Sequence, residues 1–94
     1  MLTNDEAITV GVRKYRELYP EGTLPLALEE AGVLGATPGK LATTIHVTFS
    51  IEGETEPFYL FRASVNRASG EVTIEDAADW RYLQGKQLDS SQSL

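Results

Sequence analysis

The chain contains no cysteine among its 94 residues and only one histidine, His46. The absence of cysteine excludes disulfide bonds, thiolate catalysis and sulfur-ligated zinc sites, and it leaves the redox compartment open. Basic residues are also scarce, since 8 lysines and arginines stand against 14 acids, which gives a net charge of −6. A protein that binds nucleic acid through its phosphates needs a basic surface. We therefore expect no nucleic-acid partner.

Long apolar runs are missing as well. No stretch approaches the ~20 apolar residues of a membrane-spanning helix. The opening residues, MLTNDE, lack the basic region and the apolar run of a signal peptide. Both absences predict a cytoplasmic protein without membrane association. The hydrophobic content of 41% is typical of a globular chain, and the length predicts one domain.

Motifs of catalysis and cofactor binding are equally scarce. His46 falls among threonines and a serine, so a solvated residue is favoured over a general base or a metal ligand. Residues 35–40, GATPGK, end in Gly-Lys but lack the P-loop spacing and precede a strand rather than a helix. The acidic residues at 52–56 and 71–79 lack the pattern of a calcium-binding loop. We expect no enzymatic activity, no cofactor and no metal.

Residues 41–52 show the strongest pattern that is present, an alternation of apolar and polar side chains. Because successive side chains of a strand point to opposite sides, this pattern predicts a long strand with one apolar face and one polar face. The face predicted to be covered carries Leu41, Thr43, Ile45, Val47, Phe49 and Ile51. Such a strand is typical of an antiparallel sheet that is covered on one side only.

The remaining segments predict an α+β fold, in which an N-terminal helix packs on one face of a three-stranded antiparallel β-meander, with short extra helices. Residues 1–83 form the predicted domain, and 84–94 form a flexible polar tail. Val33 and Leu34 are expected to continue the core, and 35–40 to form a loop. The predicted helices span residues 4–19, 24–31 and 76–83, and the predicted strands span 41–52, 57–66 and 71–75.

The first helix carries a recognisable start. Thr3 and Glu6 have the spacing of a capping box, in which each side chain accepts a hydrogen bond from the other residue's free backbone N–H. Gly11 falls within the apolar stripe of this helix, where it costs helix stability. Its presence there predicts a close contact between helix and sheet.

Strict alternation in the second strand assigns its side chains to two faces. Tyr59 and Phe61 then point to the helix, and Phe58, Leu60 and Arg62 point to the outer face. Two interpretations stay open. Either the segment that carries Trp80 folds back over Phe58 and Leu60, or these apolar side chains form an exposed contact patch.

Three glutamates surround the predicted turn between the first two strands. Solvated negative surface is the simplest interpretation, and a docking patch for a basic partner is the alternative. Together with the outer face, they form the predicted partner-binding set, which comprises Phe58, Leu60, Arg62, Glu52, Glu54, Glu56 and Trp80.

Residues 59–72, with the sequence YLFRASVNRASGEV, resemble the closing hairpin of PepSY-type domains. In that family an apolar strand ends in a short polar turn, which is followed by Gly, Glu and an apolar residue. The preceding helix and long strand also follow the order of the family. PepSY-type domains are small non-catalytic modules associated with inhibiting or regulating peptidases, so the resemblance implies a regulatory or inhibitory role.

These observations favour a non-enzymatic protein–protein interaction module. We expect a small acidic inhibitor, immunity or regulatory protein that acts by occupying the surface of another protein. Association of two copies through the outer sheet face is one form of this interpretation. The alternative is a small-ligand-binding domain with a pocket between helix and sheet.

Overall fold

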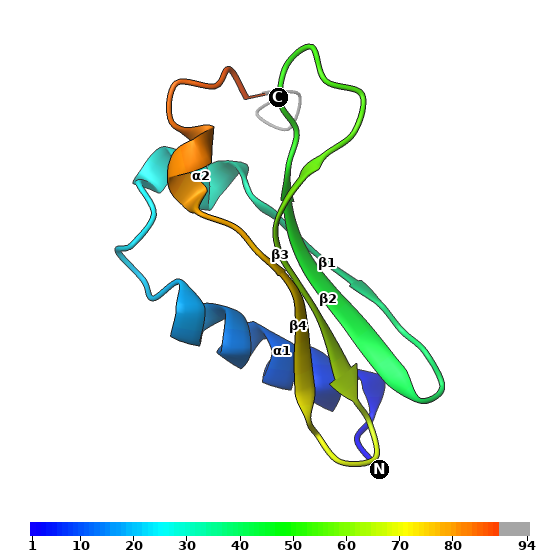
Figure 1. The fold of residues 1–94 in the computed structure, drawn as a ribbon. Helices are drawn as coiled ribbons and strands as arrows, with labels where there is room; N and C mark the ends of the chain where they lie inside the picture. The colour runs from blue at the N-terminus through cyan, green and yellow to red at the C-terminus, as the bar shows by residue number, and fades with distance from the viewer. Residues whose placement is uncertain (89–94) are drawn as a thin grey trace.

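A computed structural model of the chain describes residues 1–88, which form one long helix lying across one face of an antiparallel sheet (Figure 1). The α+β fold and the covering helix are thus confirmed. The sheet has four strands in the order β1-β2-β3-β4, rather than the predicted three. The elements are α1 (Asn4–Leu18), α2 (Leu26–Ala31), β1 (Val33–Thr37), β2 (Ala42–Phe49), β3 (Phe58–Asn66), β4 (Val72–Ala77) and the short 3₁₀ helix η1 (Trp80–Leu83).

The additional strand is β1, whose residues Val33–Thr37 pair antiparallel with β2. We expected core residues followed by a loop here, and that prediction was wrong. The segment reads VLGAT, which is short, uncharged and without alternation, so it carries no strand signal. Pairing with the long neighbouring strand, rather than its own sequence pattern, makes it a strand.

The helix α1 starts and packs as its sequence predicts. The capping box is present, because the Glu6 amide donates to the Thr3 hydroxyl and the Thr3 amide donates to the Glu6 carboxylate. The bond that the Thr3 amide donates to the carboxylate is the main cause that lowers the pKa of Glu6. Gly11 is buried against the side chain of Ile45 in β2, which confirms the close approach of helix and sheet.

The core lies between α1, α2, η1 and the inner face of the sheet. Phe49 and Phe61 are 1% and 0% exposed, which confirms their predicted inward orientation. The rings of Tyr15 and Tyr19 pack against Phe61. Tyr19 also directs its hydroxyl at the carbonyl oxygen of Ala78, 2.6 Å away, so it ties α1 to the segment that leads into η1.

A β-bulge in β3 decides which side chains face the core. Val47 pairs with Phe61, and the next residue of β2, Thr48, pairs with Tyr59. Leu60 therefore has no partner, and its side chain turns inward beside Phe61, where it is 0% exposed. The predicted faces of Phe58, Tyr59 and Leu60 were wrong, because strict alternation across the strand assumed no bulge.

The C-terminal segment packs beside the hairpin that joins β2 and β3 (Figure 1). Leu83 is 2% exposed, and Leu88 forms an isolated bridge with Ile51. The Glu52 amide donates to the carbonyl oxygen of Gln87. Residues 84–88 thus continue the fold where we expected a tail to begin, and residues 89–94 lie outside the described residues. Within residues 1–88, none of the helices has the length and apolar character needed to cross a membrane.

Candidate functional site

The outer face of the sheet, opposite α1, carries a row of three large polar or aromatic side chains from neighbouring strands. His46 of β2 meets Tyr59 of β3 edge to face, with 5.9 Å between the ring centroids. The guanidinium of Arg62 lies 5.0 Å from the centroid of the same tyrosine ring. We call His46, Tyr59 and Arg62 the outer row. His46 and Arg62 pair directly across β2 and β3, and Tyr59 contacts both because the bulge at Leu60 turns it outward.

The charge of Arg62 is balanced from the neighbouring strand. Its guanidinium forms an ion pair with Asp76 at 2.8 Å and lies 3.6 Å from a Glu75 carboxylate oxygen. A second irregularity creates this arrangement, because Arg62 pairs with Asp76 and Ala63 pairs with Ile74, which leaves Glu75 without a partner. The side chains of Arg62, Glu75 and Asp76 are about 40% exposed, so these pairs orient the arginine and contribute little stability.

His46 is the member of the outer row that lies next to β1. Its ring covers Gly35, and a side chain at that position would collide with the ring. Within residues 1–88, His46 takes part in none of the ion pairs. The same part of the chain holds no cluster of three metal-ligating side chains.

The predicted partner-binding residues divide into three locations. Arg62 lies on the outer face as predicted, whereas Leu60 is in the core and is unavailable to a partner. Phe58 stacks on Tyr82 with ring centroids 4.9 Å apart, and Trp80 packs partly buried against the same core. The segment that carries Trp80 thus packs beside Phe58, but on the inner side of the sheet, because Phe58 pairs with the buried Phe49. The prediction that Phe58 and Leu60 point to the outer face was wrong.

The three predicted glutamates lie apart from the outer row. Glu52, Glu54 and Glu56 are exposed in the connection between β2 and β3, beyond the Phe49–Phe58 pair that ends the ladder. The outer row begins further along β3, with Tyr59. The acidic turn thus borders the sheet end and leaves the centre of the outer face to other side chains.

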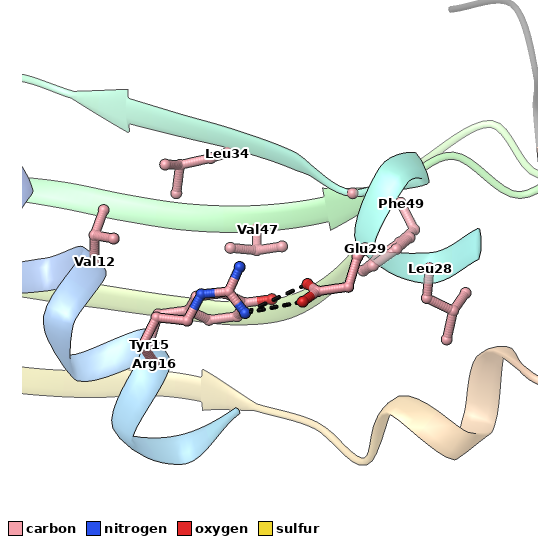
Figure 2. Close-up of a pocket in the computed structure, with 9 residues that line it drawn as sticks. Val12, Tyr15, Arg16, Leu28, Glu29, Leu34, Val47 and Phe49 are labelled. Carbon is pink, nitrogen blue, oxygen red and sulfur yellow. Dashed lines mark hydrogen bonds and ion pairs between the residues drawn. The ribbon is translucent and has the colours of Figure 1, made fainter. Parts of the chain in front are cut away.

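A groove lies on the opposite side of the sheet. Figure 2 shows it between α1, α2 and the first two strands, with the Arg16–Glu29 ion pair of 3.1 Å across it. Its volume is 140 Å³. Its apolar lining includes Val12, Leu28, Leu34, Val47 and Phe49.

Sequence reasoning missed Tyr59 as an outward residue. One signal was available: residues 58–61, FYLF, are four apolar residues in succession, and a run of this kind interrupts alternation. A bulge within the run allows Leu60 and Phe61 to enter the core together.

Comparison with known proteins finds no matching family model, no matching curated protein and no matching solved structure. The resemblance to PepSY-type domains therefore stays a prediction.

Proposed function

We propose that this chain is a non-enzymatic protein-interaction module that binds another protein through the outer face of its sheet. The observation that carries the proposal is the outer row, in which His46, Tyr59 and Arg62 form an ordered cluster on a face that no described element covers. Tyrosine and arginine are enriched among the residues that contribute most to protein–protein affinity. An inhibitory, immunity or regulatory role by occupation of a partner's surface is consistent with such a contact.

The setting of Tyr59 supports the proposal further. Tyr59 is 37% exposed and its ring contacts both an imidazole and a guanidinium, so less side-chain entropy is left to lose on binding. Thr48 lies opposite it on β2, and Thr44 and Ser64 pair with each other further along the same face, where they supply hydroxyl groups for a polar rim. Glu54 and Glu56 lie beyond the sheet end, where negative charge accelerates the encounter with a basic partner.

Binding of a small ligand in the groove is the weaker candidate. The groove holds 140 Å³, below the ~300–1,000 Å³ typical of small-molecule sites. Its two charged side chains, Arg16 and Glu29, already pair with each other. A ligand would have to break that pair to use either group.

A capture experiment with matched variants tests the proposal. The wild-type chain, Tyr59→Ala and Tyr82→Ala are each immobilised and exposed to extract of the native host. Tyr82 is the control because it is also exposed and has a cation, Lys86, 4.7 Å from its ring centroid, but it stacks on Phe58 instead of lying in the outer row.

We expect one stoichiometric protein that wild type and Tyr82→Ala retain and Tyr59→Ala loses. Capture that is equal for all three, or lost only with Tyr82→Ala, would place the contact elsewhere. Stabilisation of the chain by metabolites, abolished by Arg16→Ala, would favour the groove instead.

A further inference from the structure

The two edges of the sheet differ in how they are protected against pairing. Edge strands are normally shielded by charges, prolines, bulges or covering elements. The edge strand β4 has a bulge at Glu75 and carries the charges of Glu75 and Asp76. The other edge, β1, has no charged residue and no bulge, and its Val33 and Leu34 are 40% and 51% exposed.

We propose that two copies of this chain associate edge to edge through β1, antiparallel, around a two-fold axis at Gly35. This register places Leu34 of one copy opposite Ala36 of the other, so a large side chain faces a small one. It also places Val33 opposite Thr37, both β-branched. Pairs of this kind stabilise antiparallel strands.

In this arrangement the inner face of one copy continues into the inner face of the other. Within one copy, Leu34 and Ala36 pair with Val47 and Ile45 of the inner face. The joined strands therefore continue the apolar side beneath the helices. The two Leu34 side chains become diagonal neighbours, close enough to contact each other.

Charge complementarity at the ends of β1 favours a second copy as the occupant. The helix α2 and the turn before β2 lie at opposite ends of β1 (Figure 1). The helix carries Glu30 and the turn carries Lys40, and both residues are exposed. Neither takes part in an ion pair within residues 1–88. Antiparallel pairing brings α2 of each copy beside the turn of the other, so Glu30 and Lys40 meet twice.

The association goes beyond the proposed function and does not depend on it. A two-fold axis perpendicular to the sheet keeps both outer faces on the same side. The dimer therefore presents the outer row twice on one continuous surface. A partner with a repeated epitope would bind both copies at once and gain avidity.

Sedimentation equilibrium tests the association, with Leu34→Lys as the disruptive variant and Leu18→Lys as the control. Leu18 is a similarly exposed leucine, 42% against 51%, at the end of α1. Circular dichroism verifies that both variants fold. We expect wild type and Leu18→Lys to dimerise with equal affinity and Leu34→Lys to weaken the dimer by roughly a hundredfold, since a charge is placed in an apolar pair.

Either of two results would overturn the proposal. One is a wild-type chain that stays monomeric up to about 1 mM, the weak end of specific association. The other is a dimer that Leu34→Lys leaves intact. Should Leu34→Lys fail to fold, Lys40→Glu provides the test. Lys40→Glu should weaken the dimer roughly tenfold, and the double variant Glu30→Lys/Lys40→Glu should restore the wild-type affinity. A Lys40→Glu chain that dimerises as strongly as the wild type would contradict the register.

Cysteine cross-linking tests the two-fold axis directly, because the chain has no cysteine of its own. A mixture of Val33→Cys and Thr37→Cys chains should form a disulfide-linked pair rapidly, since directly opposed residues have the required spacing. Each variant alone should link slowly. Faster linking of Val33→Cys with itself would overturn the proposed axis, and it would leave the outer-row proposal unaffected.

Discussion

Shortening Leu60 to alanine tests the β-bulge that decides which side chains face each side of the sheet. Leu60 is 0% exposed and packs in the main core, so its truncation leaves a cavity among fully buried neighbours. Truncations of this kind cost about 2–5 kcal/mol. The free energy of unfolding of a 94-residue domain is roughly 5–14 kcal/mol, so the loss is a large share of the total.

Urea denaturation followed by circular dichroism measures this loss. For a domain of this size, unfolding free energy falls by about 1 kcal/mol for each molar of urea, so the midpoint should drop by about 2 M or more. Leu60→Asp should not fold, because it buries a carboxylate without a partner.

Tyr59→Ala is the matched control, because Tyr59 is the neighbour of Leu60 in the sequence but faces the outer side of the sheet. Tyr59 is 37% exposed, and its ring lies against His46 and Arg62 on the outer face rather than in the core, so its loss should cost no more than about 1 kcal/mol. The reverse order, with Tyr59→Ala costly and Leu60→Ala neutral, would refute the bulge and restore strict alternation in β3.

Three further predictions concern the packing of the helix and the C-terminal segment. Tyr19→Phe should lower the free energy of unfolding by about 1 kcal/mol, because it removes the hydrogen bond to the Ala78 carbonyl. Burial raises the pKa of Tyr19 above its ordinary value of 10.0. The stability that comes from burying the neutral phenol is therefore present below pH 10 and is lost as the pH rises further. Because phenylalanine does not titrate, the melting temperature of Tyr19→Phe should decline less at alkaline pH than that of the wild type. Gly11→Ala should lower the melting temperature, because about 1–3 kcal/mol of overpacking against Ile45 outweighs the gain in helix propensity of up to ~1 kcal/mol. A raised melting temperature would contradict the close packing. Truncation after Leu83 should lower the melting temperature further than truncation after Leu88, because only the shorter chain loses the Ile51–Leu88 bridge.

Much of the fold follows from local patterns in the sequence. The capping box, the helix stripe around Gly11 and the alternation of β2 depend on residues a few positions apart, so they predict α1, β2 and its covered face from Thr43 to Ile51 correctly. The assignment of Leu41 to the same face was wrong, because Leu41 lies before the strand and is 77% exposed. Phe49 and Phe61 were assigned to the core on the same basis. These features require no knowledge of distant contacts.

The features that were missed depend on pairing between segments. The strand β1 is fixed by the register of Val33–Thr37 against β2, and nothing within VLGAT specifies it. The bulge at Leu60 adds one residue to β3, so Leu60 and Phe61 both point into the core. A prediction based on strict alternation cannot place two successive side chains on the same face. The outer row depends on that bulge. Strict alternation assigns Tyr59 to the inner face, so the sequence pattern alone did not predict its place in the outer row.

Protection of a single thiol on the outer face tests the proposed function most directly. Thr48→Cys introduces a unique thiol beside Tyr59, because Thr48 is its direct partner across β2 and β3 and the chain has no other cysteine. Leu18→Cys supplies an exposed thiol on α1 as the control. With the captured protein bound at saturation, alkylation of Thr48→Cys should slow at least tenfold and alkylation of Leu18→Cys should be unchanged. Unchanged alkylation of Thr48→Cys in the complex would contradict binding through the outer row.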